Sequence, residues 1–154
     1  MVLEIGRKAP GFELRDETGR TRRLSDYQGK YVLLYFYPKD DTPGCTIEAC
    51  NFRDDYSQFD NNNVTILGVS PDSPESHTKF KNKYNLPFIL LADEDHQVCE
   101  LYGVWGSKKS FGKEYDGVQR TTYLIDPDGS IQIVFKNVSP AKHSTEVLAA
   151  IGTE

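Results

Sequence analysis

The sequence predicts an α/β fold in which a mixed central sheet carries helices on both faces. Strand-like apolar segments alternate with helical patterns along most of the chain, which is typical of this class. One segment, residues 31–37 (YVLLYFY), is continuously apolar, as in a strand buried on both faces. Near the end, two strand-like segments flank a turn at 126–129 (DPDG), which indicates an antiparallel hairpin within the sheet.

The elements follow in order along the chain. The opening segment predicts an N-terminal β-hairpin, with strands at 12–14 and 21–24 around a turn at 16–19. Strand 31–37 comes next, and the apolar spacing then predicts one helix from Cys45 to about Phe59. The later elements are expected as strands 64–69, 88–92, 120–125 and 131–135 and as helices 74–84, 97–102 and about 140–151, the last stopped by Gly152. This order fits a thioredoxin-like domain.

Length and composition limit the classes of protein. A chain of 154 residues suffices for one domain with a core, so residues 1–154 are expected to form a single domain. The formal net charge of -5 argues against nucleic acid or an anionic membrane surface as a partner. No apolar run approaches the roughly 20 residues that a membrane helix needs. The basic pair Lys108 and Lys109 is expected to be solvated surface.

Cysteine usage indicates the compartment. Three cysteines are an odd and small number for a disulfide scaffold. The first residues lack a basic start followed by a long apolar stretch, so no secretion signal is expected. Both observations favour a reducing, cytoplasmic location, where a pair of cysteines is more often redox-active or metal-binding than structural.

Two of the three cysteines, Cys45 and Cys50, follow strand 31–37 closely. The predicted helix begins near Cys45, where unpaired backbone N–H groups and the helix dipole favour a thiolate. We therefore expect Cys45 to be a reactive thiol, although an isolated cysteine is more often a small buried apolar residue. Cys50 is suited to resolve an oxidised Cys45 sulfur by forming a disulfide. The spacing differs from the C-x-x-C pattern of disulfide exchange.

A zinc site is the alternative for these cysteines. A ligand set of three cysteines and one histidine would consist of Cys45, Cys50, His96 and Cys99. The two halves of this set lie about fifty residues apart, and neither has the tight spacing of a zinc knuckle, so no metal is expected. His77 and His143 have no cysteine or carboxylate cluster around them in the predicted elements. The sequence also lacks the nucleotide-binding and serine-hydrolase motifs.

One stretch resembles a known family. Residues 38–45 (PKDDTPGC) match the peroxiredoxin signature of a proline, three residues, a threonine, two residues and a cysteine. The following residues 46–50 (TIEAC) are similar to the bacterioferritin comigratory protein (PrxQ) subfamily, whose resolving cysteine lies five residues after the peroxidatic one. The resemblance extends to residues 9–12 (APGF), 68–70 (GVS) and 120–126 (RTTYLID).

The resemblance implies a thioredoxin-fold peroxidase without metal, haem or flavin. Such an enzyme reduces hydrogen peroxide and organic hydroperoxides, and thioredoxin or a similar dithiol protein returns the electrons. Cys45 would be the peroxidatic cysteine and Cys50 the resolving cysteine. Thr42 would hydrogen-bond the peroxide, Arg120 would hold the thiolate and the transition-state oxygens, and Pro38 would shield the sulfur from water.

Each of these roles has a structural alternative. A threonine before a helix is commonly a cap, a proline can simply end a strand, and an arginine at a strand edge can be structural. The resemblance, and not residue chemistry, distinguishes Arg120 from Arg53. It also assigns Glu48 to the substrate-binding residues, where this carboxylate would help to orient Arg120. Cys99 lies outside the motif and is expected to be a small core residue.

Two further expectations concern the whole molecule. The alternative function is a non-enzymatic domain of the same fold that binds zinc or a protein partner through the cysteine loop. A resolving cysteine in the same chain removes the chemical need for a dimer, so a monomer is expected. In an intact helix, residues five positions apart have Cα atoms roughly 8.7 Å apart on nearly opposite faces. This exceeds the limit of about 7 Å for a disulfide, so the helix must open to join Cys45 and Cys50.

Overall fold

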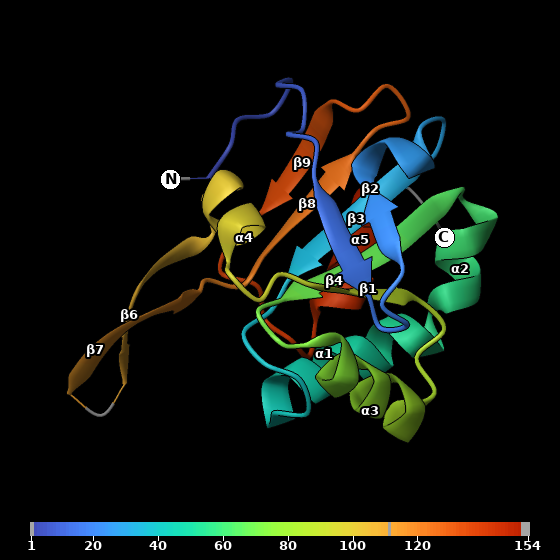
Figure 1. Ribbon diagram of the computed structural model, residues 1–154. Coiled ribbons are helices and arrows are strands. Elements are labelled where there is room, and N and C mark those ends of the chain that lie inside the picture. Colours follow the sequence, from blue (N-terminus) through green and yellow to red (C-terminus); the bar gives the residue numbers. More distant parts are fainter. Residues whose placement is uncertain (1, 111, 152–154) are drawn as a thin grey trace.

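A seven-stranded mixed sheet forms the centre of the computed structural model, which describes residues 2–110 and 112–151 (Figure 1). The strands are β1 (Glu13–Asp16), β2 (Thr21–Arg23), β3 (Tyr31–Phe36), β4 (Val64–Ser70), β5 (Ile89–Ala92), β6 (Trp105–Ser110), β7 (Lys113–Val118), β8 (Thr121–Ile125) and β9 (Ile131–Phe135). The helices are the 3₁₀ helix η1 (Leu24–Tyr27) and the α-helices α1 (Pro43–Asp54), α2 (Tyr56–Asn61), α3 (Pro74–Tyr84), α4 (Gln97–Leu101) and α5 (His143–Ala150).

The sheet is parallel at its centre and antiparallel at its edges. Its strand order is β2-β1-β5-β4-β3-β8-β9. The pairs β3/β4 and β4/β5 are parallel, whereas β3/β8, β8/β9, β1/β5 and β1/β2 are antiparallel. The predicted mixed sheet, the N-terminal hairpin and the hairpin near the end are therefore confirmed.

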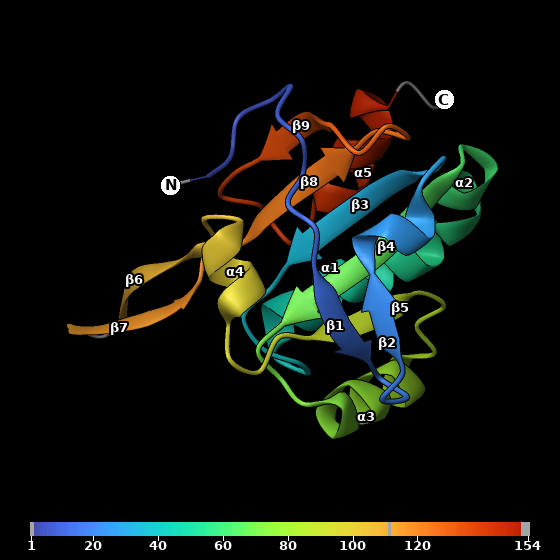
Figure 2. The same ribbon diagram turned by 45° about the horizontal axis from the view of Figure 1, so that its top comes forward.

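Helices cover both faces of the sheet, as predicted, but unequally. The side chains of Leu33 and Tyr35 point to the face that packs against α1, α2, α3 and α5. Their neighbours Leu34 and Phe36 point to the other face, which is covered by α4 and by the N-terminal segment. Figure 2 shows α1 behind the strands and β1 in front of them. Among the described residues, none of the helices combines the length and apolarity that a bilayer crossing requires.

The single helix expected from Cys45 to Phe59 is two helices. The first, α1, already begins at Pro43, because a proline at the first helical position needs no backbone N–H partner. It ends before Asp55, whose backbone lies outside helical values at φ -97° and ψ 6°. The Asp55 carboxylate accepts a hydrogen bond from Ser144 of α5 at 2.7 Å, a tertiary contact that the local pattern does not reveal.

The last helix also differs in its bounds. The segment from residue 140 was expected to be helical, but α5 begins at His143, after a turn at 139–142. The expected stop at Gly152 lies outside the described residues.

A two-stranded arm formed by β6 and β7 was not predicted. It stands apart from the main sheet, beyond α4 (Figure 1). Most of its side chains are polar or charged, so it lacks the alternation that marks a half-buried strand. The arm returns to the core at Val118, which is 1% exposed, two residues before Arg120.

Candidate active site

Cys45 lies in the first turn of α1, as the sequence predicts. The residue is 2% exposed and packs against the face of the sheet that carries Tyr35. Thr42 precedes the helix in an extended conformation, and Pro43 begins it. The backbone N–H groups of a first helical turn have no acceptor within their own helix, and the helix dipole is positive at this end. The Cys45 sulfur is therefore in a position that favours negative charge.

Arg120 joins Cys45 to Glu48. Its Nη2 donates to Cys45 Sγ at 3.3 Å and its Nη1 donates to Glu48 Oε1 at 2.8 Å. The Arg120 side chain is 16% exposed and the Glu48 side chain is fully buried. A Cβ atom at position 44 would lie 3.4 Å from Arg120 Nη2, so the guanidinium packs close to the backbone of Gly44. The predicted grouping of Cys45, Glu48 and Arg120 is present in the structure.

The Glu48 carboxyl group is buried beside the charged Arg120. Burial raises the pKa of its carboxyl to about 7, although the charge and hydrogen bond of Arg120 act in the opposite direction. Of its two oxygens, Oε1 accepts from Arg120, whereas Oε2 is buried without a hydrogen-bond partner among the described residues. Removing a carboxylate from water costs more than one ion pair returns, which explains the direction of the shift.

Thr42 and Pro38 lie on the loop between β3 and α1. The Thr42 hydroxyl donates to Lys39 O at 2.9 Å and makes no side-chain cap to α1, so the simple helix-cap role is not observed. Its proton is used by this bond, which leaves the oxygen lone pairs as acceptors. Pro38 is half-buried and lines a hollow of about 300 Å³ whose other side is the β6/β7 arm.

Lys108 of the β6/β7 arm reaches this region, contrary to the expectation of a solvated basic pair. Its Nζ donates to Val118 O at 2.9 Å. Burial and the nearby Arg120 charge lower the pKa of Lys108, while Cys45 acts in the opposite direction. Lys109 is exposed, as expected. Lys108 was missed because the arm that carries it was missed.

Cys50 and Cys99 have different surroundings. Cys50 lies on α1, is partly exposed and is not bonded to another cysteine. Cys99 is fully buried and packs on the opposite face of the sheet from Cys45. Burial, reinforced by the Asp93 carboxylate, raises the pKa of the Cys99 thiol. Cys99 therefore has the surroundings expected of a core residue.

The zinc ligand set is not assembled in the structure. Cys45 and Cys99 are separated by the sheet. His96 is partly exposed instead, with its ring stacked on Trp105 at a centroid distance of 3.9 Å and its Nδ1 2.9 Å from Glu100 Oε2. The geometry contradicts the alternative in which these residues bind one metal ion.

The expectation that His77 and His143 lack carboxylate neighbours is wrong. His77 Nδ1 lies 2.6 Å from Asp40 Oδ2, and His143 Nδ1 lies 2.9 Å from Glu146 Oε1. Asp40 is 37 positions away from His77 in the sequence, so no local pattern could have found this pair. Glu146 is three positions from His143, a spacing that brings side chains together on a helix and was overlooked.

Comparison with known proteins identifies the family of the chain. Residues 5–134 match the model of the AhpC/TSA family. The chain is 52% identical over 151 residues to Peroxiredoxin Bcp of Bacillus subtilis. The alignment covers 98% of this chain and 96% of the relative. It is 49% identical over 146 residues to Peroxiredoxin Bcp of Escherichia coli K12, with 95% and 94% covered.

Solved structures give the same result. A mutant of PrxQ from Xylella fastidiosa superposes with a TM-score of 0.92 at 34% identity and covers 98% of this chain and 96% of its own. The bacterioferritin comigratory protein of Xanthomonas campestris, described for alkyl peroxide reduction, superposes with a TM-score of 0.86 at 36% identity, with 91% and 89% covered. The thioredoxin-like fold predicted from the order of elements is confirmed, and the chain belongs to the AhpC/TSA family as a peroxiredoxin of the Bcp/PrxQ group, a thiol peroxidase.

Proposed function

We propose that Cys45 is the peroxidatic cysteine and Cys50 the resolving cysteine of this thiol peroxidase. The observation that carries the proposal is the hydrogen bond from Arg120 Nη2 to Cys45 Sγ at the first turn of α1. A neighbouring guanidinium and a helix N-terminus both favour the thiolate, which is the nucleophilic form of cysteine.

In the first step, the Cys45 thiolate attacks the terminal oxygen of the hydroperoxide and the O–O bond breaks. The attacked oxygen remains on the sulfur as a sulfenic acid. The second oxygen leaves as hydroxide or alkoxide and takes up a proton, which gives water or an alcohol. Negative charge moves from the sulfur to the leaving oxygen, so fixed donors that face both centres lower the barrier. Arg120 offers several donors in one plane, and its bond to Glu48 fixes the orientation of that plane.

Thr42 and Pro38 complete the proposed peroxide site. The Thr42 hydroxyl already donates to Lys39 O, so its oxygen is available to accept the O–H of the peroxide. Pro38 has no backbone N–H and presents an apolar ring, which fits the role of excluding water from the sulfur. Glu48 contributes to substrate binding through Arg120.

In the second step, the Cys50 thiol attacks the sulfenic sulfur, a disulfide forms and water leaves. Both cysteines lie on α1 in the structure, where the helical geometry keeps their sulfurs apart. Resolution therefore requires that the first turns of α1 unwind. A dithiol reductant then restores both thiols.

We propose thioredoxin or a similar dithiol protein as this reductant, in a reducing, cytoplasmic compartment. An intrachain disulfide can be reduced by exchange with an external dithiol, without any other cofactor. Organic hydroperoxides are proposed as substrates beside hydrogen peroxide, in line with the alkyl peroxide reduction described for the Xanthomonas campestris protein. The two cysteines lie in one chain, so the cycle can be completed by a monomer.

Steady-state turnover with purified thioredoxin, thioredoxin reductase and several hydroperoxides tests the proposed function. The wild type should turn over, and Cys45→Ser should have no activity. Cys50→Ser should consume one equivalent of peroxide and then stop as a sulfenic acid. Full turnover by Cys45→Ser would overturn the assignment of the peroxidatic cysteine, and continued turnover by Cys50→Ser with thioredoxin would overturn that of the resolving cysteine.

A further inference from the structure

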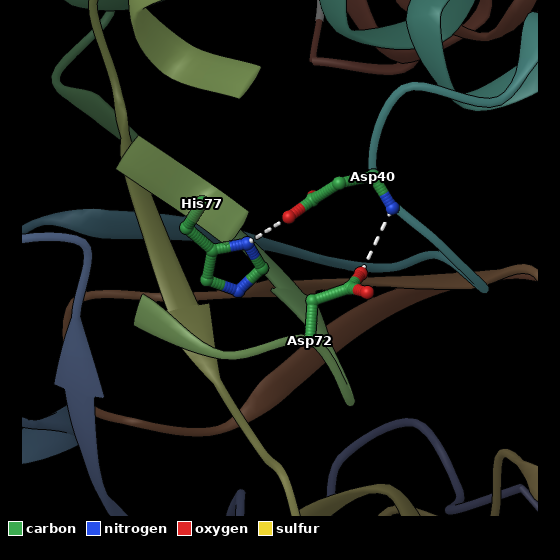
Figure 3. A group of neighbouring side chains, drawn as sticks. All are labelled: Asp40, Asp72 and His77. Carbon is green, nitrogen blue, oxygen red and sulfur yellow. Dashed lines mark hydrogen bonds and ion pairs between the residues drawn. The ribbon is translucent and has the colours of Figure 1, made fainter. Parts of the chain in front are cut away.

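Asp40, in the loop that joins β3 to α1, lies beside His77 of α3 and Asp72, which follows β4 (Figure 3). Its Oδ2 lies 2.6 Å from Nδ1 of His77 on α3 and accepts the Ser76 hydroxyl at 2.9 Å. Its Oδ1 accepts the hydroxyl of Tyr37, just after β3, at 2.5 Å. Its backbone N–H donates to Oδ2 of Asp72, just after β4, at 2.8 Å. Every polar group of this side chain therefore has a partner.

The same residues are a candidate metal cluster by proximity, because Asp40, Asp72 and His77 each bring a ligand atom to within 4.8 Å of the others. The distances do not support coordination. Two ligands that share a tetrahedral zinc ion at about 2.0–2.1 Å lie roughly 3.3 Å apart. Asp40 Oδ2 and His77 Nδ1 are only 2.6 Å apart, which is the distance of a charge-assisted hydrogen bond.

The contacts of the His77 ring specify its protonation state. Its Nε2 lies 2.9 Å from Leu91 O, which can only accept, so Nε2 carries a hydrogen. Its Nδ1 faces a carboxylate that also accepts from two hydroxyl groups, which favours a hydrogen on Nδ1 as well. These contacts favour an imidazolium at His77, whose side chain is 0% exposed and lies against the Asp40 carboxylate.

The charges around the ring agree with this state. Burial disfavours the charged ring, but the hydrogen bond and negative charge of Asp40 outweigh it and raise the pKa of His77, and Asp72 acts in the same direction. Tyr37 is the third titratable group that faces the ring, at 3.5 Å. Burial and the Asp40 charge raise the pKa of Tyr37 well above its ordinary range, so its hydroxyl keeps its proton and donates.

A second tether holds the next residue of the loop. Asp41 has a positive φ of 58°, which asparagine and aspartate tolerate better than most residues. Its Oδ2 accepts from Lys83 Nζ at 2.8 Å and its Oδ1 accepts from the Tyr84 hydroxyl at 2.9 Å. Both partners are on α3. Side chains of this helix therefore bond two successive aspartates of the loop, Asp40 and Asp41.

We propose that the Asp40–His77 ion pair is a positioning element for the peroxide reaction, which fixes loop 38–42 to α3 and so places Pro38 and Thr42 correctly for attack by Cys45. The inference rests on the proposed function of these residues. Asp40 is the middle of the five loop residues, and Thr42 leads directly into the helix that carries Cys45. The ion pair touches neither the sulfur nor Arg120 in the described contacts, so its effect on the reaction passes through the backbone of the loop.

The test compares two reactions of Cys45 in the reduced protein at pH 7. Stopped-flow measurement gives the second-order rate of oxidation by hydrogen peroxide, which needs the positioned loop. Alkylation by iodoacetamide gives the rate of a reaction that needs only an accessible thiolate. Asp40→Asn and His77→Gln should each lower the peroxide rate about ten- to a hundredfold, the size of effect that small misplacements cause. The alkylation rate should fall by less than twofold or rise.

The double variant and a control make the result specific. If the two residues act as one pair, the double variant should lose no more than either single variant. Lys81→Gln is the control: Lys81 lies on the same helix α3, but its Nζ bonds Glu17 Oε1 at 2.9 Å, in the turn between β1 and β2 and not in loop 38–42. It should leave both rates within twofold of the wild type.

Three results would overturn the inference. The first is a peroxide rate within twofold of the wild type in folded Asp40→Asn, which preserves the shape of the side chain. The second is an equal loss of both rates. The third needs no variant: a ¹⁵N spectrum of the wild type that shows a neutral His77 ring at pH 7. If the wild type itself fails to oxidise Cys45, the proposed function fails instead, and the two failures are thereby distinguished.

Discussion

Arg120 Nη2 lies 3.3 Å from Cys45 Sγ, although the two residues are 75 positions apart. The contact follows from the direction of one strand. Because β8 runs antiparallel to β3, its first residue, Thr121, pairs with Phe36, the last residue of β3. Arg120, the residue before β8, therefore lies next to the end of β3, where the loop toward Cys45 begins. The topology brings a permanent positive charge to the cysteine.

Arg120→Lys should slow peroxide oxidation on the order of 10²-fold, although the charge is kept. A lysine ammonium is a point charge that cannot bond the Cys45 sulfur and Glu48 with two donors in one plane. Stopped-flow measurement of the rate at which peroxide oxidises Cys45 tests this prediction. A loss of less than threefold would mean that Arg120 is only structural. Arg53→Lys is the matched control, since Arg53 bonds Tyr84 O away from the cysteine, and should leave the rate unchanged within twofold.

Glu48→Gln should change how stability depends on pH. The pKa of Glu48 is raised by burial from 4.5 to about 7 in the folded protein, so the folded state binds the proton more tightly than the unfolded state. The stability contribution is fully present below pH 4.5 and is lost as pH rises to about 7. At about 1.4 kcal/mol per pKa unit, the loss is roughly 3 kcal/mol.

Urea unfolding of wild type and Glu48→Gln between pH 4.5 and 8 measures this difference. The variant cannot titrate at this position. The free energy of unfolding of the variant minus that of the wild type should therefore increase as pH rises. A difference that stays constant across the range would show that burial does not shift this carboxyl. Glu94→Gln, a change at an exposed carboxylate in the segment between β5 and α4, serves as a control for general charge effects.

Cys99→Ala should leave thioredoxin-dependent turnover within twofold of the wild type. Cys99 packs on the opposite face of the sheet from Cys45 and is fully buried, and its pKa is raised by that burial and by Asp93. A lost sulfur in the core will lower the melting temperature, so activity is to be measured well below it. If this variant accumulates Cys45 sulfenic acid, Cys99 and not Cys50 is the resolving partner.

The sequence predicts those parts of the molecule that local patterns specify. Strand β3 is apolar on both faces, and the position of Cys45 at a helix start follows from the loop before it. The arm formed by β6 and β7 has no apolar alternation and could not be recognised in this way. At the end of α1, Asp55 accepts a hydrogen bond from Ser144, 89 positions away, a contact that no local pattern reveals.

The same distinction holds for the site: local sequence patterns indicate some of its residues, and only the fold reveals the others. The spacing of Cys45 and Cys50 suggested their chemistry from the residues alone, whereas Arg120 was selected only by resemblance to a family. Asp40 and His77 were missed because the fold, and not the spacing, brings a loop carboxylate to a helix histidine. Partners of this kind are visible only once the order of the strands is known.

Disulfide formation should be accompanied by local unfolding of α1. Cys45 and Glu48 are buried in the ordered helix, and Phe52 in its last turns is fully buried in the core. We expect the first turns to open in the oxidised protein while the end of the helix stays anchored by Phe52. Amide hydrogen exchange across residues 42–55 should show lower protection in the disulfide form for residues 43–50, as for other segments of low local stability. Equal protection in both forms contradicts a Cys45–Cys50 bond.

The central claim is that one peroxide molecule oxidises Cys45 and that Cys50 resolves it within the same chain. Peptide mass spectrometry of the reduced wild type after one equivalent of hydrogen peroxide tests this most directly. The account predicts the loss of two hydrogens from the peptide that contains both Cys45 and Cys50, with Cys99 still a free thiol. An unmodified Cys45, or a disulfide that includes Cys99, would contradict it.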